Sequence, residues 1–369
     1  MTASNDDRAR FIDRSGVDEP DLDQLLWPAL IVSKEEIEAE ADRLAALPAP
    51  SNGRRRSLIV HPAASEPGLG LAPGIQVALE VLLPGERTHP CRQNSAIVNF
   101  CIGGQGFSVV RGEKIDFSLH DVWLTPSLDT YVHENNSDER QIRLAYSNAA
   151  LLEKLNVHFV DPEPPEEPTV PPEGAEEEVA AHPFADVFPL SEGGPLVMSY
   201  ERLISPEVVE QTPLHWPWGN VKAELDKLTA LGAEYKGRRL YLLYNPATGR
   251  TNGTTNSFFA TMCVRPPGIV DRPHRHSSAA INYFFSGQGY SRVGGRRYDW
   301  KAGDLMLSAP GWAIHNHASG DAPVYELTIQ DSPLHLAMDS LMWQEDLKKT
   351  PVLLGSHQGW RTNREALAR

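Results

Sequence analysis

Four of the thirteen histidines stand in two short motifs whose residue types and spacing suit metal binding. His274 and His276 are two residues apart, and on a β-strand residues with that spacing point to the same side. A third ligand then has to come from a distant strand, and the motif with His315 and His317 can supply it. Two close histidines with a remote third are typical of a site for a divalent metal.

Short apolar or alternating segments around these histidines predict β-strands. They cover residues 278–285, 290–293 and 304–308, with glycine-containing turns at 286–289 and 294–295. Many short strands joined by close turns favour a barrel or jelly roll over a parallel α/β sheet. Such a fold would bring both histidine motifs into one interior.

The chain contains this unit twice. A shift of 183 residues places Pro84-Gly85 on Pro267-Gly268, Asn99 on Asn282 and residues 104–106 on residues 287–289, without a gap. So many matches in a short stretch indicate a duplicated domain.

The first copy lacks the histidine pattern of the second. We place Cys91, Gln93 and His133 at the positions of the three metal-binding histidines. Glutamine is a poor metal ligand, so the first copy is expected to have a degenerate site. A competing interpretation is a second metal site formed by His89, Cys91 and His133.

Two helices are expected outside the duplicated units. Ser33 and Glu36 have capping-box spacing and open an amphipathic segment that continues to about Leu47. A second helix is expected from Asn220 to Leu231. Each unit therefore begins with a helical arm.

Composition excludes several classes of function. The 369 residues carry a formal net charge of −15, which argues against nucleic-acid or anionic-membrane partners, because phosphate binding requires a basic face. Residues 161–178 contain eight acids, six prolines and no base, so an extended linker is expected rather than a strand or helix. Three cysteines are too few for a disulfide framework. Residues 1–16 do not read as a secretory signal, and no apolar run approaches the roughly 20 residues that span a bilayer, so we expect a cytoplasmic protein.

The histidine motifs resemble those of the cupin family, whose first motif is a glycine, five residues, His-x-His, a later glutamate and a glycine. Gly268, His274-Arg-His276 and Gly287 match it, with Ala280 at the glutamate position. Residues 303–315 approximate the second motif. Without the glutamate the three ligands are neutral, so a divalent metal would keep its full charge.

Among cupins, the three-histidine set resembles the bicupin ring-cleaving dioxygenases of the gentisate and salicylate 1,2-dioxygenase type. Residues 244–249 and the His-Asn-His motif at 315–317 agree with this, and the resemblance covers roughly residues 54–155 and 237–345. It implies an all-β fold of two tandem cupin (double-stranded β-helix, jelly-roll) barrels with a few peripheral helices, and a homo-oligomer.

The resemblance also implies a reaction. His274, His276 and His315 would hold Fe(II), and a hydroxylated or aminated aromatic compound would chelate the iron while O2 takes the open position. His317 would contact the substrate or accept a proton, since histidine exchanges protons near neutral pH. The protein would then be an oxidoreductase of aromatic-compound catabolism.

Two departures from that group concern the location of the metal and the substrate. The resembling enzymes keep iron in the N-terminal barrel, whereas the intact triad here is C-terminal. They also carry an arginine for the substrate carboxylate where this chain has Asn282, which can form hydrogen bonds but no bidentate ion pair. Either the substrate lacks that carboxylate, or it meets a different cation such as Arg275 or Arg292. The expected substrate contacts are Asn282, Gln93, Arg275, Arg292 and Trp312, with His317 and Asn282 as catalytic residues.

Two other classes of function use the same residues. One is a metal-dependent isomerase or hydrolase with Zn, Mn or Ni at the triad and no O2 chemistry. The other is a non-catalytic binding or storage cupin.

The expected organisation has six segments. They are an N-terminal helical arm (1–53), an N-terminal cupin with a degenerate metal site (54–160), an acidic proline-rich linker (161–180), a helical arm (181–236), a C-terminal cupin with the metal site (237–345) and a C-terminal tail (346–369).

Overall fold

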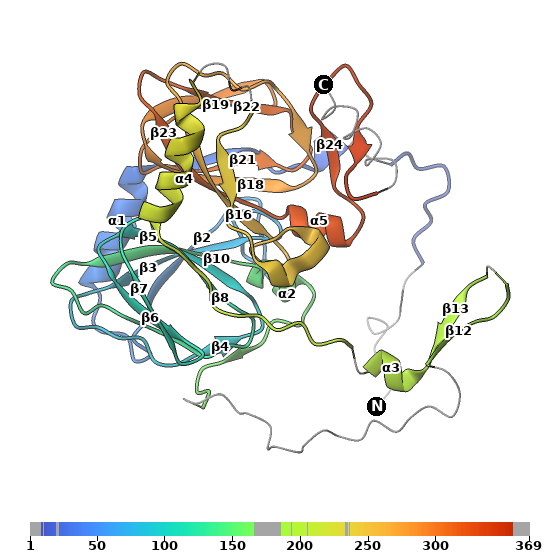
Figure 1. Ribbon diagram of the computed structural model, residues 1–369, viewed down its shortest axis with the longest axis horizontal. Coiled ribbons are helices and arrows are strands. Elements are labelled where there is room, and N and C mark those ends of the chain that lie inside the picture. The colour runs from blue at the N-terminus through green and yellow to red at the C-terminus, as the bar shows by residue number, and fades with distance from the viewer. Residues whose placement is uncertain are drawn as a thin grey trace.

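The computed structural model describes residues 9, 11–19, 22–165, 186–192, 194–204, 206–232, 235 and 237–356. The chain is mostly β, as its short alternating segments predicted (Figure 1). Its strands form two β units that follow one another along the chain. None of the described helices is long and apolar enough to cross a membrane.

The first β unit contains a six-stranded and a three-stranded antiparallel sheet. The six-stranded sheet has the order β14-β8-β5-β10-β3-β2 and the other the order β7-β6-β9. The strands are β2 (Arg55–Ile59), β3 (Gln76–Leu82), β5 (Ile97–Gly103), β6 (Gly106–Val110), β7 (Glu113–Phe117), β8 (Val122–Thr125), β9 (Tyr131–Glu134), β10 (Gln141–Ser147) and β14 (His215–Trp216).

The second β unit repeats this arrangement. Its six-stranded sheet has the order β1-β21-β18-β23-β16-β15 and its three-stranded sheet the order β20-β19-β22. The strands are β1 (Leu30–Val32), β15 (Leu240–Leu242), β16 (Phe259–Arg265), β18 (Ala279–Ser286), β19 (Gln288–Val293), β20 (Arg296–Lys301), β21 (Leu305–Pro310), β22 (His315–Ser319) and β23 (Val324–Gln330). The three segments expected as strands in this unit are confirmed as β18, β19 and β21.

The main core lies between the two six-stranded sheets. Alternate residues of each sheet, such as Val98 and Phe100 on β5 and Ile281 and Tyr283 on β18, belong to one buried cluster. The rings of Phe100 and Tyr283 meet edge to face at 5.6 Å. The other face of each six-stranded sheet packs on its own three-stranded sheet and forms the interior of that unit.

Each unit receives one strand from the segment that precedes the other unit. The short strand β1 pairs with β21 of the second unit, and β14 pairs with β8 of the first. The following helices, α1 (Lys34–Ala46) and α4 (Trp218–Ala230), are anchored in matching ways. The Lys34 amide donates to Asp304 Oδ1 at 2.8 Å, and the Trp218 amide donates to Asp121 Oδ1 at 2.6 Å.

The first expected helix is confirmed with its capping box intact, and the second begins two residues earlier than predicted. The other described helical elements are short. They are α2 (Ala149–Lys154), α3 (Tyr200–Ile204), α5 (Ser332–Ala337) and the 3-10 segments η2 (Leu22–Leu25) and η4 (Pro246–Thr251). Figure 1 shows α3 apart from both units, beside the hairpin of β12 (Val187–Pro189) and β13 (Leu196–Met198).

One strand pair corrects the expected linker. Residues 160–161 form β11 (Val160–Asp161), which pairs with β4 (Arg92–Gln93), although the prolines and acids from residue 161 onward predict neither a strand nor a helix. The Arg92 Nε donates to Asp161 Oδ2 at 2.9 Å, so an ion pair holds the first acid of the acidic run in the sheet. Residues 166–180 of that run lie outside the described residues.

A similar small sheet closes the second unit. It joins β17 (Arg275–His276), β24 (Met342–Gln344) and β25 (Val352–Leu353). The segment expected as a C-terminal tail therefore contributes a strand.

Candidate metal centre

Three histidines converge in the second unit. His274 precedes the short strand β17, His276 lies on it, and His315 begins β22; reciprocal backbone hydrogen bonds of 3.1 and 2.9 Å join His274 to His315. One ring nitrogen from each histidine lies within 4.8 Å of the other two, and all three side chains are buried. The predicted triad therefore forms a compact group of nitrogen donors.

Backbone carbonyls orient all three imidazoles. The Nδ1 atoms of His274, His276 and His315 lie 3.2, 2.8 and 2.9 Å from the carbonyl oxygens of residues 272, 278 and 313. A carbonyl can only accept, so each Nδ1 carries the hydrogen and each Nε2 keeps a free lone pair. This tautomer leaves Nε2 of each ring free to bind a metal.

The surroundings keep the triad neutral. Burial lowers the pKa of His315 to about 3 and lowers the pKa of His276 well below the ordinary histidine value. Burial also lowers the pKa of His274, assisted by the positive charge of Arg238. Neutral imidazoles are the metal-binding form, so the donor set fits a divalent cation.

No carboxylate joins this group among the described residues, where it is the only such cluster of histidine, cysteine and acidic side chains. Ala280, at the position of the cupin glutamate, is buried on β18. His89, Cys91 and His133 do not bring their ligand atoms together in the part of the chain that the structure describes.

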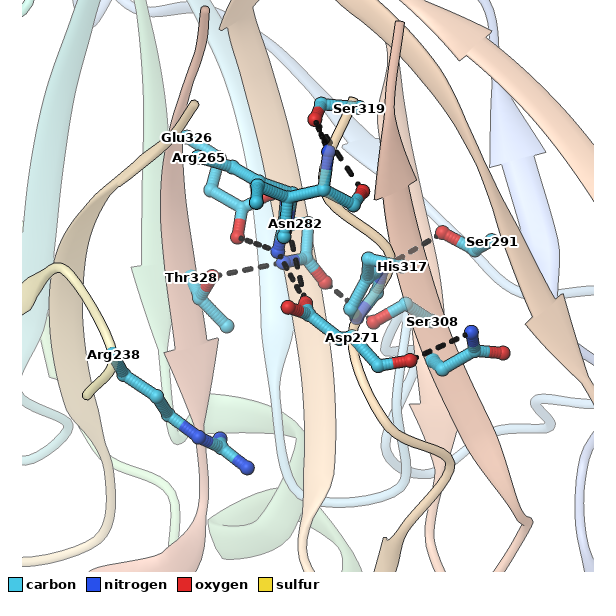
Figure 2. Close-up of polar contacts among 12 residues, drawn as sticks. Arg238, Arg265, Asp271, Asn282, Ser291, Ser308, His317, Ser319, Glu326 and Thr328 are labelled. Carbon is cyan, nitrogen blue, oxygen red and sulfur yellow. Dashed lines mark hydrogen bonds and ion pairs between the residues drawn. The ribbon is translucent and has the colours of Figure 1, made fainter. Parts of the chain in front are cut away.

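His317 lies two residues beyond His315 on the same strand and faces the same interior. Its Nδ1 is 2.7 Å from Ser291 Oγ (Figure 2). That oxygen also accepts a hydrogen bond of 2.9 Å from Trp300 Nε1. Burial, then the charge of Arg265, lowers the pKa of His317 well below its ordinary value. This differs from the expected proton exchange near neutral pH, since the buried ring is held in its neutral form.

Both the Nδ2 and the Oδ1 atom of Asn282 form hydrogen bonds with side chains of the second unit. Its Nδ2 donates to Thr328 Oγ1 at 2.8 Å, and its Oδ1 accepts from Ser308 Oγ (Figure 2). The amide is buried on β18, so side chains already take up its hydrogen-bonding groups in this structure.

Arg275, one of the two cations predicted to bind the substrate, contacts other side chains of the protein. Arg275 alternates with His274 and His276 along the chain; its Nε donates to Gln344 at 2.6 Å and its guanidinium lies 4.4 Å from the centre of the Trp312 ring. Trp312 therefore packs with Arg275.

The other two predicted contacts also lie away from the triad. Arg292 is exposed on β19, where strand alternation turns it away from the face used by Ser291. Gln93 lies on β4 of the first unit and not in the unit that holds the triad.

Two residues beside the triad were not predicted. Trp343 pairs with His276 across β17 and β24, and its ring stacks on that imidazole at 5.1 Å and 21°. Arg238 lies 5.8 Å from the Trp343 ring centre and pairs with Glu345 at 3.1 Å. Its positive charge contributes to the lowered pKa of all four histidines.

A signal for Arg238 exists in the duplication. Glu80 of the first unit and Cys263 of the second are equivalent under the shift of 183. Arg56 pairs with Glu80 and Leu240 pairs with Cys263, so Arg56 is equivalent to Leu240. Two residues earlier, Arg54 is therefore the counterpart of Arg238. The gap-free shift of 183 misplaces this pair by one residue. Trp343 has no comparable signal, because the long-range pairing of β24 positions it.

The register also corrects the expected counterparts in the first unit. Cys91 bridges Tyr131 as His274 bridges His315, so Tyr131, and not His133, occupies the place of the third ligand. His133 faces Ser108 across β6 and β9. It therefore corresponds to His317, which faces Ser291.

Comparisons with known proteins agree with this geometry. Residues 264–359 match the model of a family described as an AraC-like ligand binding domain. The chain is 26% identical over 308 residues to 1-hydroxy-2-naphthoate 1,2-dioxygenase of Nocardioides sp. (strain KP7), covering 81% of this chain and 74% of that protein. It is also 26% identical over 268 residues to 5-aminosalicylate 1,2-dioxygenase of Comamonas sp., covering 70% of this chain and 66% of that protein.

Among solved structures, a salicylate 1,2-dioxygenase from Pseudaminobacter salicylatoxidans has a similar fold. The TM-score is 0.70 over 90% of this chain and 91% of that chain, with 16% sequence identity. The chain is therefore a relative of the gentisate- and salicylate-type 1,2-dioxygenases, the group that its histidine motifs resemble.

Proposed function

We propose that the protein is an Fe(II)-dependent ring-cleaving dioxygenase whose active site lies in the second unit, and that each unit is a cupin barrel. Its substrate is an aromatic acid with a hydroxyl or amino group on the ring. The observation that carries the proposal is the buried group of three neutral histidines with their Nε2 atoms free. It is supported by relatives whose names describe 1,2-dioxygenases of hydroxylated aromatic acids.

The triad would hold the iron through His274, His276 and His315. With three neutral ligands the metal keeps a net charge of +2, which favours a chelating anion. Iron(II) bound there supplies an open coordination position and the one-electron chemistry that lets O2 react with an aromatic ring. In the overall reaction the ring C–C bond breaks and each of its two carbons becomes bonded to one atom of O2, so no separate reductant is consumed.

Arg238 is the cation best placed for a substrate carboxylate. Its side chain is 53% exposed beside the triad, and its present partner Glu345 is also exposed, so an incoming carboxylate can replace that partner. Trp343 provides an aromatic wall over His276.

The remaining residues orient the reacting groups. His317 is held by Ser291 as a neutral ring, which suits a hydrogen bond to a substrate oxygen. We assign Asn282 to positioning within the interior, since Thr328 and Ser308 bind both ends of its amide.

Oxygen consumption with a panel of aromatic acids tests this function. The panel should contain salicylate, gentisate, 5-aminosalicylate and 1-hydroxy-2-naphthoate, each with its decarboxylated analogue. We expect one O2 consumed per molecule of at least one acid, with loss of ring absorbance. Iron binding without O2 uptake would favour the isomerase or hydrolase alternative, and absence of metal binding would favour a binding cupin. A cytoplasmic location and a homo-oligomer stay predictions.

A further inference from the structure

The interior of the first unit contains three buried polar atoms without a hydrogen-bond partner among the described residues. They are Asn99 Oδ1, Trp123 Nε1 and Arg143 Nε. The three residues are at most 1% exposed, so solvent at the surface does not satisfy these atoms. Burying an unpaired donor or acceptor is unfavourable, and such groups normally have a partner.

These atoms lie on one patch of the sheet. Asn99 on β5 is directly opposite Trp123 on β8, and Arg143 on β10 is opposite Cys101, two residues from Asn99. The patch faces the interior, because Trp123 stacks on Phe117 of β7 at 4.0 Å. The three side chains therefore lie on neighbouring strands of the face that lines the interior of the first unit.

The second unit has different residues at two of these positions. Met306 stands opposite Asn282 where the first unit has Trp123 opposite Asn99. In the second unit Thr328 also stands opposite Asn282 and accepts from its Nδ2 at 2.8 Å.

Ala145 replaces that threonine in the first unit, so the amide of Asn99 has only Thr125 as a partner among the described residues. Arg143 stands where the second unit has Glu326, as the pairings with Glu80 and Cys263 show. Compared with the second unit, the first unit therefore has two additional N–H donors, Trp123 and Arg143, and lacks the threonine that binds the asparagine amide.

The charge around the patch is positive. Arg143 donates to Glu80 through Nη2 and to Gln141 through Nη1, which leaves Nε free. Arg56 also pairs with Glu80, at 3.2 Å, and Arg54 lies 5.0 Å from the centre of the Tyr131 ring. Three arginines thus face one carboxylate.

Apolar side chains complete the interior. Val110, Ile115 and Phe117 of the three-stranded sheet are buried in one cluster with Trp123. Planar N–H donors, excess positive charge and an apolar wall suit an organic anion better than a hydrated inorganic one.

We propose that the first unit binds a small organic carboxylate without a metal, through Trp123 Nε1, Arg143 Nε and the amide of Asn99. Either end of that amide can bond to Thr125 Oγ1, so Asn99 can turn its NH2 group toward the carboxylate. The site is separate from the triad and goes beyond the proposed dioxygenase activity.

Binding of radiolabelled benzoate to the iron-loaded, full-length protein under nitrogen tests the proposal. Benzoate has a carboxylate but no hydroxyl group to react. We expect two sites per chain by equilibrium dialysis. Trp123→Phe keeps the ring stack on Phe117 and removes one donor, so it should weaken one site about tenfold and leave turnover unchanged.

Two further variants make the result specific. Trp216→Phe removes an indole from the neighbouring strand on the other face of the same sheet and should leave both sites intact. Ala145→Thr should supply the missing partner of Asn99, weakening the same site while raising the thermal midpoint.

The outcomes separate this site from the proposed function. If dialysis finds a single benzoate site per chain and Trp123→Phe does not change its affinity, the proposal is wrong. The three unpaired atoms would then be assigned to ordered water. Inorganic sulfate competing as well as benzoate would overturn the organic-anion class. A Trp123-dependent site in a protein without dioxygenase activity would support this inference while the proposed function fails.

Discussion

Ser291 Oγ lies 2.7 Å from His317 Nδ1, and Ser108 Oγ lies at the same 2.7 Å from His133 Nδ1 in the first unit. The contact is thus present in both units, although only the second unit has the three-histidine group among the described residues. One unit therefore serves as an internal control for the other.

Ser291→Ala should lower turnover without loss of metal. Ser291 Oγ accepts from Trp300 Nε1, so its own hydrogen is free to donate to His317 Nδ1 and favour the Nε2–H tautomer. Loss of this bond should reduce kcat about tenfold, the cost of one buried hydrogen bond. Ser291→Thr should restore most of it.

Steady-state kinetics with iron analysis of each variant checks this. Ser108→Ala is the matched control and should leave kcat unchanged. Wild-type kcat in Ser291→Ala at full iron content would show that the serine does not position His317.

Arg238→Met should raise KM for carboxylated substrates about tenfold and affect their decarboxylated analogues much less. The reason is that the Arg238 charge lies beside the triad, whereas Arg292 points away from it. Arg292→Met is the control, with KM expected to be unchanged. Equal effects of Arg238→Met on acids and their analogues would contradict a carboxylate-binding role.

The stability of the protein should depend on Asp331 between pH 4 and 8. Burial raises the pKa of Asp331 to about 7, and its Oδ1 accepts from the Ala279 amide at 2.7 Å. In the unfolded chain the pKa is about 3.9, so the folded state retains a proton that the unfolded state has released. The resulting stabilisation is complete below about pH 4 and is lost as the pH rises through 7, a change of about 4 kcal/mol at most.

Asp331→Asn should remove this dependence, because Asn148 Oδ1 accepts from the Ala96 amide at the equivalent place of the first unit at 3.1 Å. Urea unfolding at pH 5, 6.5 and 8 should show the variant gaining stability over wild type as the pH rises. Asp339→Asn changes an exposed acid and should track wild type. A constant difference between Asp331→Asn and wild type across this range contradicts the raised pKa.

The sequence predicts those features that local spacing determines. His274 and His276 direct their rings to one site, Ser33 and Glu36 form their capping box, and the two glycine-containing turns join β18 to β19 and β19 to β20. The duplication is visible because the turns that match between the two copies keep a spacing of 183 residues over most of the unit.

Features that depend on loop length or distant pairing are not visible. The loop before His317 is one residue longer than the loop before His133, so a gap-free shift pairs the wrong residues. Trp343 reaches His276 only because β24 adds to β17. The strand β1 has three residues, too few for a periodic pattern, and pairs with a partner far along the chain.

Iron content and O2 uptake measured on the same anaerobically purified protein test whether the three histidines of the second unit form the active site. We expect one iron per chain and O2 uptake with an aromatic acid. Both should be lost in His276→Ala and kept in Cys91→Ala, which alters the corresponding position of the His274 ligand in the first unit. Iron and O2 uptake that survive His276→Ala but disappear in Cys91→Ala would contradict this assignment.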